Sequence, residues 1–480
     1  MNASMLIAAP ELLVLIMGCV VLCVDPFLRE DRRGIIHMLG MLTLLLAAII
    51  TLRHEPAGAG QAAVTAFNGA FISDPMSDVL KLFAYATLGL VFVYAKHYLR
   101  TFDQFRADYY TLSLFALLGV MLLISANSLI MVYLGLELTS LASYALVALN
   151  RKSARGSEAA MKYFVLGSMA SGLLLYGMSM VYGATGSMAL PVIAESLAAN
   201  GTDDVLLIVG LVFMVIGIAF KLGVVPFHMW VPDVYDGAPL AATLFISTVP
   251  KLAAFAMAYR ILAVGLGEMQ GDWQQMLAAL ALASLIIGNL TAIVQTNIRR
   301  MLAYSTVGHM GFVLLGMLPG TATGYGSSLF YIVVYALMSA AGFGMLVLLS
   351  GRGVDCEQLD DLKGLNRRNG WYAAIMAMVM FSMAGVPVFV GFFAKLLVIK
   401  AVLDAGMINL AVAAVVFSVI GAFYYLRVVK LMYFDEPAAE TRFEPPVDFS
   451  AAISLNGVLM LGLGFFSGSL IALCVNSFLV

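Results

Sequence analysis

Four ionisable residues lie deep within long apolar stretches of a chain that is only 11% charged: Glu137, Lys221, Lys251 and Lys395. A charge at the centre of a bilayer costs about 2.5–3.5 kcal/mol on insertion scales, so such residues face a protein interior or a hydrated path. They are typical of ion and proton routes. The sequence therefore predicts a protein that moves charge across a membrane.

The bulk composition indicates the class of protein in which these residues function. Of the 480 residues, 62% are hydrophobic, and the mean hydropathy is +0.97. A helix needs roughly 20 apolar residues to cross the hydrocarbon core, and this chain has many such runs. We predict an all-α, polytopic membrane protein. The net charge of −2 says little about partners, and the sequence shows no nucleic-acid-binding face.

The apolar runs predict about 14 transmembrane helices. Their expected ranges are 5–24, 34–52, 77–97, 109–126, 128–149, 158–183, 204–226, 239–265, 273–296, 301–319, 326–350, 371–403, 408–433 and 450–477. The range 371–403 is too long for one straight helix. It contains Gly385, Pro387 and Gly391, which predict a helix broken within the membrane.

Basic residues predict the orientation of these helices, because cytoplasmic loops collect Lys and Arg. Every second loop holds a basic cluster: Arg29, Arg32 and Arg33; Lys96, Arg100 and Arg106; Arg151, Lys152 and Arg155; Arg299 and Arg300; Arg352, Lys363, Arg367 and Arg368; Arg427, Lys430 and Arg442. The loops expected in the cytoplasm include 151–157 and 352–368, and those expected outside include 53–73 and 186–202. Both termini should then lie on the outer side. Lys81 and Lys162, near helix ends, are expected to extend toward the interface.

One loop on the predicted cytoplasmic side has no Lys or Arg and is the densest local motif: Pro226-Phe227-His228-Met229-Trp230-Val231-Pro232-Asp233-Val234-Tyr235-Asp236-Gly237-Ala238-Pro239. Its prolines prevent a continuous helix. We interpret these prolines and Asp233 as structural, with His228 fixing the turn. Trp230 and Tyr235 suit a position at the membrane interface.

The proline-rich motif is one of an ordered set. The others are Gln295-Thr296-Asn297-Ile298-Arg299-Arg300-x-Leu302-Ala303-Tyr304-Ser305, Gly308-His309-Met310-Gly311-Phe312, and Gly385-x-Pro387-x-x-x-Gly391-Phe392-x-x-Lys395. With this set the chain resembles the antiporter-like membrane subunits of respiratory complex I and their relatives in multisubunit cation/proton antiporters. Within that family it is most similar to the subunit N branch of bacterial NADH:quinone oxidoreductase. The largest homologous subunit has a carboxy-terminal arm for which no residues remain after Val480, and the middle-sized one usually has Glu in place of Lys395.

The resemblance implies two inverted repeats of five helices, each with a discontinuous helix. The predicted domains are 1–108 (flanking helices), 109–265 (first repeat), 273–433 (second repeat) and 434–480 (flanking helix). Lys221 precedes Pro226 and Lys395 follows Pro387, which suits opposed orientations of the broken helices. Relatives often have Pro-Pro in the second broken helix, where this chain has Pro387-Val388.

A carboxylate at the depth of Glu137 needs a cationic partner, and we expect Lys221 to provide it. The alternative is a purely structural ion pair. Burial favours the neutral amine of Lys221, whereas a nearby carboxylate favours the ammonium, so movement of Glu137 would switch Lys221 between the two forms. The alternative for Lys221 is that its side chain extends to the membrane interface, so that its ammonium group lies in water.

Lys251 lies at the centre of its span, without a route to either interface, and a structural role is its alternative. Lys395, beside the second break, is predicted to be the last proton donor or acceptor of the protein before the outer bulk phase. Its alternative is to extend to the membrane interface. Related subunits use histidines on the eleventh helix, where this chain has none, so the intervening relay must rest on hydroxyls and water. The candidates are Ser305, Tyr304, Tyr335, Ser339 and Tyr424, with His309 as either a relay or a packing residue.

No nucleotide-binding glycine loop or iron–sulfur spacing is present in the sequence, so we predict no cofactor or metal in this chain. The resemblance implies a proton-translocating membrane subunit of NADH:quinone oxidoreductase in the bacterial inner membrane. NADH, FMN, iron–sulfur clusters and quinone would then belong to partner subunits, both membrane and peripheral. Two alternatives stay open: a subunit of a multisubunit sodium/proton antiporter, and a structural membrane scaffold.

Overall fold

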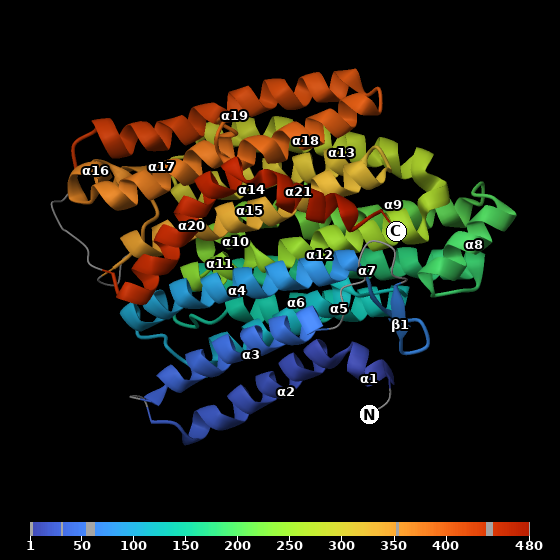
Figure 1. The fold of residues 1–480 in the computed structure, drawn as a ribbon, viewed down its shortest axis with the longest axis horizontal. Helices are drawn as coiled ribbons and strands as arrows, with labels where there is room; N and C mark the ends of the chain where they lie inside the picture. The colour runs from blue at the N-terminus through green and yellow to red at the C-terminus, as the bar shows by residue number, and fades with distance from the viewer. Residues whose placement is uncertain (1–2, 30–31, 54–62, 352–354, 438–444, 480) are drawn as a thin grey trace.

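The computed structural model describes residues 3–29, 32–53, 63–351, 355–437 and 445–479 (Figure 1). Arg352 and Arg442, and parts of the loops 53–73 and 352–368, lie outside these ranges. The amino-terminal part contains α1 (Ala3–Ile7), α2 (Ala9–Val24), η1 (Asp25–Phe27), α3 (Gly34–Arg53), β1 (Val64–Ala66), β2 (Phe71–Ser73) and α4 (Pro75–Thr101).

Two longer series of helices follow. The first contains α5 (Ala107–Ile124), α6 (Leu129–Val147), α7 (Ala154–Thr185), α8 (Leu190–Asn200), α9 (Val205–Leu222), α10 (Trp230–Gly237), α11 (Leu240–Ile246), α12 (Val249–Ala258) and η3 (Tyr259–Gly265). The second contains η4 (Gly267–Met269), α13 (Gln270–Val294), α14 (Ile298–Met317), α15 (Ala322–Leu349), η5 (Leu359–Leu362), α16 (Leu365–Arg368), α17 (Gly370–Ala384), α18 (Val390–Asp404) and α19 (Ile408–Phe434). The chain ends with α20 (Val447–Phe465) and α21 (Ser467–Asn476).

The predicted class, a helical multi-pass membrane protein, is confirmed. Within the described residues, 12 helical segments are long and apolar enough to cross a membrane. Two further predicted spans correspond to α14 and to the pair α17 and α18. The number 14 stays a prediction. The antiparallel hairpin of β1 and β2 is an addition that the apolar runs did not predict.

Polar side chains begin many of the helices in the two series. Ser128, Ser153, Asp204, Asn297 and Thr321 each accept a hydrogen bond from a backbone N–H in the first turn that follows. Such caps satisfy N–H groups that have no partner within the helix. The caps therefore place each helix start at a polar residue of the sequence.

The basic loops gather at one end of the bundle. Ion pairs join Lys96 to Asp448 at 2.6 Å and Arg155 to Glu357 at 2.9 Å, and Asp355 contacts both Arg299 and Tyr98. Figure 1 places both termini, β1 and α8 at the end opposite to α16. The arrangement agrees with the alternation of basic loops, and the side of the membrane stays a prediction.

Two interrupted helices lie within the bundle. α9 ends at Leu222 and α10 begins at Trp230, while α17 ends at Ala384 and α18 begins at Val390. The predicted breaks near Pro226 and Pro387 are therefore confirmed. The pair α5 and α6 and the pair α13 and α14 make the most extensive helix contacts in the described chain, one pair in each predicted repeat. The repeat boundaries themselves stay a prediction.

Candidate functional site

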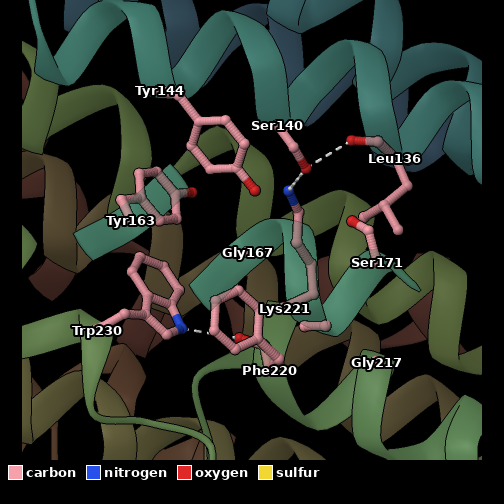
Figure 2. A pocket seen from close by; sticks show the side chains of 11 residues that line it. Leu136, Ser140, Tyr144, Tyr163, Gly167, Ser171, Gly217, Phe220, Lys221 and Trp230 are labelled. Carbon is pink, nitrogen blue, oxygen red and sulfur yellow. Dashed lines mark hydrogen bonds between the residues drawn. The ribbon is translucent and has the colours of Figure 1, made fainter. Parts of the chain in front are cut away.

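Lys221 lies in the last turn of α9 and points into the bundle. Its ammonium donates a hydrogen bond to Ser140 Oγ at 3.0 Å, and Ser140 donates to the Leu136 carbonyl at 2.7 Å. Figure 2 shows this chain of contacts at the edge of a small pocket that Tyr144, Tyr163 and Trp230 also line. Because only 7% of Lys221 is exposed, it does not extend to the surface as the alternative required.

Glu137 lies on the outward side of α6. Its helix neighbours Ile130, Leu134 and Leu141 are each more than half exposed, and Glu137 itself is half-buried. Its Oε1 atom is buried without a hydrogen-bond partner in the described part of the chain. The direct ion pair expected with Lys221 is absent there. The depth of a residue in the sequence predicts its position along a helix, whereas its direction depends on packing.

Lys251 lies in the first turn of α12, where Pro250 follows a kink after α11, and is 1% exposed. Its Nζ atom donates to the Leu222 carbonyl at 2.7 Å and to the Lys221 carbonyl at 3.4 Å. It also lies 5.1 Å from the centroid of the Trp230 ring. The central lysine is therefore attached to the end of α9, beside the backbone of Lys221.

Lys395 makes the equivalent contact at the second break. Its Nζ atom donates to the Ala384 carbonyl at 2.9 Å and to Ser418 Oγ at 3.0 Å, and it lies 5.4 Å from the Phe312 ring centroid. The side chain is 8% exposed. Lys395 therefore remains inside the bundle, attached to the last carbonyl of α17.

The two breaks share one local chemistry. Gly223 and Gly385 follow α9 and α17 with φ of +77° and +84°, a conformation in which a side chain is strained. A Cβ atom on either glycine would lie 3.4 Å from the Nζ atom of Lys251 or Lys395. The carboxyl end of a helix carries partial negative charge that stabilises a cation. Each break thus provides a site for one buried ammonium group.

The predicted hydroxyl candidates separate into two groups. Ser305 contacts Tyr425, and Tyr335 donates to Thr306 at 2.8 Å, so both lie beside His309. His309 is buried and hydrogen-bonded on both ring nitrogens. The structure therefore brings Ser305, Tyr335 and His309 together near Lys395.

The other candidates lie beside this group with different partners. Tyr424 donates to Asn289 at 3.2 Å, and Ser339 donates to the Ser247 carbonyl at 3.4 Å. The Tyr304 ring packs against His228, with centroids 6.2 Å apart. The sequence analysis missed four residues that contact the lysines or His309: Ser140, Ser418, Tyr331 and Tyr425. Their only sequence signal was a hydroxyl within an apolar span, which many residues share.

The aromatic residues of the proline-rich motif are buried, so their predicted interfacial position is wrong. Trp230 is 2% exposed and Tyr235 is fully buried. Trp230 stacks on Tyr163 at a centroid distance of 4.6 Å and donates to the Phe220 carbonyl at 3.0 Å (Figure 2). These contacts pack Trp230 against α7 and α9 beside the first break. The types of residue in the motif do not show which helices they contact.

The polar residues of the same motif link helices. Asp233 on α10 accepts from Lys162 on α7 and from Arg300 on α14, each at 2.9 Å. The buried His228 ring interacts with the Pro226 backbone, in agreement with its predicted role in the turn. Pro232 lies within the first turn of α10 and is buried. Asp233 therefore joins the two predicted repeats.

A second group of buried charges corrects the expectation for Lys81. Its ammonium forms an ion pair with Glu11 at 2.7 Å, and both side chains are almost fully buried. Arg260 donates two hydrogen bonds to Asp74, at 2.6 and 2.9 Å. Lys81 does not extend to the interface, because a carboxylate on a neighbouring helix stabilises its charge inside the bundle.

No group of three or more His, Cys, Asp or Glu residues that could hold a metal ion occurs among the residues that the structure describes. The buried basic groups beside the two helix breaks are Lys221, Lys251 and Lys395, and His309 lies near Lys395 between two tyrosine hydroxyls. Lysine and histidine side chains accept and release protons, so this arrangement is suited to proton transfer.

Comparison with known proteins finds similar chains in NADH-quinone oxidoreductase and in the Mrp complex. The family model of the NADH:quinone oxidoreductase/Mrp antiporter, TM, matches residues 126–421. NADH-quinone oxidoreductase subunit N of Thioalkalivibrio sulfidiphilus is 52% identical over 98% of this chain and 97% of that protein. A chain of respiratory complex I from Thermus thermophilus, solved with aureothin, has a TM-score of 0.82 at 30% identity, covering 96% of this chain and 98% of that one. A chain of the Mrp complex from Dietzia sp. DQ12-45-1b shares the fold, with a TM-score of 0.86 at 23% identity over 99% of this chain and 97% of that one.

Proposed function

The chain belongs to the NADH-quinone oxidoreductase subunit N family, and we propose that it is the proton-translocating membrane subunit of a bacterial respiratory complex I. The observation that carries the proposal is the pair of buried ammonium groups at the two helix breaks, Lys251 and Lys395. Charges buried in a membrane are costly and mark ion routes. Broken helices supply the polar backbone groups that such a route needs.

In this proposal, neighbouring subunits transmit a change that alters the distance between Glu137 and Lys221. Loss of the nearby carboxylate favours the neutral amine of Lys221. Its proton passes to Lys251 and then to Lys395 for outward release, and reloading occurs from the cytoplasm. The contact of Lys251 Nζ with the Lys221 carbonyl supports the first transfer. Moving one charge against 100 mV requires about 2.3 kcal/mol, which the partner subunits must supply.

The redox chemistry belongs to partner subunits in this proposal. Those subunits bind NADH, FMN, iron–sulfur clusters and quinone, and this chain contributes the membrane path. The location is the bacterial inner membrane, with both termini on the outer side, as the alternation of basic loops predicts. The chain thus acts on protons and water while it contacts lipid and the other subunits.

Lys251→Ala tests the proposal in the intact complex. We expect normal assembly but strongly reduced proton pumping and NADH:quinone reductase activity, because the central ammonium is lost. Lys400→Ala is the matched control, since Lys400 is an exposed lysine of α18. If the Ala variant does not assemble, Lys251→Met retains most of the packing volume. An assembled Lys251 variant that pumps like the Lys400 control would refute the proposal.

A further inference from the structure

The second helix break contains a strained residue. Val388 has a φ of +86°, in a break whose other left-handed residue is Gly385. A β-branched residue rarely adopts this conformation, and such strain persists only where the surrounding structure enforces it. The Val388 side chain is 46% exposed, so burial of that side chain does not compensate for the strain. Contacts of the Val388 backbone must therefore hold this conformation.

Gly464 of α20 makes a close contact with this backbone. A Cβ atom at Gly464 would collide with the Val388 carbonyl oxygen and would lie 3.1 Å from the carbonyl carbon of Phe389. The obstacle is a peptide group, which cannot turn aside as the end of a flexible side chain can. The absence of a side chain at Gly464 therefore lets α20 lie directly against the loop of the second break.

Other contacts attach α20 firmly to the bundle. Asn456 is fully buried, and its amide donates to the Leu337 carbonyl of α15 and to Tyr94 Oη of α4, each at 3.3 Å. Gly457 packs closely against Ile375 of α17. α20 also packs against α18, so it contacts the helices on both sides of the break (Figure 1). It thus supports the loop from outside the two predicted repeats.

The loop connects Val388 to both partners of the Lys395 contact. Ala384, which accepts from Lys395 at 2.9 Å, ends α17 four residues before Val388. α18 begins at Val390, two residues after Val388, and carries Lys395 in its second turn. The Val386 N–H donates at 3.0 Å to a carbonyl in the last turn of α17, which ties the loop to that helix. A displacement of Val388 therefore changes the position of Lys395 relative to the carbonyl that binds it.

The first break is held in a different way. Among its residues 223–229, all of which the structure describes, only Gly223 has a positive φ. The Val225 N–H of this break donates at 2.9 Å to Ser284 Oγ of α13. A helix of the second series therefore supports the first break, whereas the flanking helix α20 supports the break that binds Lys395.

We propose that α20 sets the geometry of the second helix break, with Gly464 and Val388 as positioning residues for Lys395; their role in proton transfer rests on the proposed function. Both residues act on Lys395 through the loop 385–389. A displacement of about 1 Å at a reacting group lowers a rate by up to about a hundredfold. The same displacement would break the hydrogen bond between Lys395 and Ala384, because such bonds require a donor–acceptor distance near 3 Å.

Gly464→Ala tests this inference, and Gly462→Ala is the matched control on the same helix. A Cβ atom at Gly462 would have no neighbour within 4 Å. We expect the assembled G462A complex to pump protons normally and the assembled G464A complex to pump at least about tenfold more slowly, because its methyl group displaces the Val388 peptide. A structure of the G464A complex should show the bond between Lys395 and Ala384 broken. A G464A complex that pumps like G462A, or that retains this bond, would overturn the inference.

A second substitution in the loop separates positioning from general packing. Glycine at position 388 lets the peptide turn its carbonyl away from the new methyl group, so adding Val388→Gly to G464A should restore pumping. Val386→Gly is the control, since the atoms nearest to a Cβ at Gly464 belong to Val388 and Phe389 instead. The absence of rescue by Val388→Gly, or equal rescue by both substitutions, would contradict the inference. If G464A alone does not assemble, assembly and pumping of the same two double variants decide between these outcomes.

The result for Lys251→Ala distinguishes this inference from the proposed function. If pumping persists without Lys251, the proposed function itself fails. If pumping requires Lys251 but G464A pumps like G462A, only the support of the second break by α20 fails.

Discussion

Gly385 offers a direct test of the contact between Lys395 and the end of α17. A Cβ atom at Gly385 would lie 2.9 Å from Lys395 Cδ and 3.4 Å from its Nζ. The Gly385→Ala substitution must therefore displace the lysine, which donates to the Ala384 carbonyl at 2.9 Å. We expect the assembled G385A complex to lose most of its proton pumping.

The size of the effect follows from two separate costs. A residue with a side chain at the left-handed φ of Gly385 costs about 1–2 kcal/mol, which lowers the stability of the break. The lost hydrogen bond of the ammonium costs about 1.5–3 kcal/mol. Since 1.36 kcal/mol corresponds to a tenfold change, the second cost alone predicts a decrease of about tenfold to a hundredfold in a transfer that requires this lysine position.

Gly406→Ala separates the two costs. Gly406 also has a positive φ, +77°, but a Cβ atom there would have no neighbour within 4 Å. Both variants carry the backbone strain, and only G385A displaces Lys395. The assay is NADH-driven proton uptake by sealed inverted vesicles, divided by the amount of assembled complex. If G385A and G406A pump at the same rate, the reasoning about Lys395 is refuted. A loss that is equal in both variants would result from backbone strain alone.

Three further predictions concern the gate, the buried charges and the orientation. Glu137→Gln and Lys221→Ala should each reduce pumping, and the double variant should be little worse than either, because both act on one step; effects that multiply independently would contradict this. Arg260→Met breaks a buried ion pair and should lower the unfolding free energy by about 3–5 kcal/mol, whereas an unchanged thermal midpoint of the purified complex would disprove it. A single cysteine in 151–157 should resist an impermeant reagent on intact cells while one in 186–202 reacts, and the reverse pattern would invert the topology.

The sequence alone determined the class of protein, the two helix breaks and the lysines beside them. Apolar runs of membrane length are local features, and so are prolines and glycines that interrupt them. A charged residue in such a run is visible without any structure because its cost in lipid is so large. Lys221, Lys251 and Lys395 could therefore be identified by type and depth, and all three are buried in the structure.

Only the tertiary structure decided which groups these residues contact. Glu137 and Lys221 lie in separate helices, and the rotation of each helix placed Ser140, rather than the carboxylate, beside the ammonium. Tyr424 and Tyr425 are adjacent in the chain, yet only Tyr425 bonds to His309. Successive residues on a helix point in directions about 100° apart. Hydrophobicity does not distinguish those directions in a helix that is apolar on every side, so packing among helices far apart in the sequence selects the residue that completes the site.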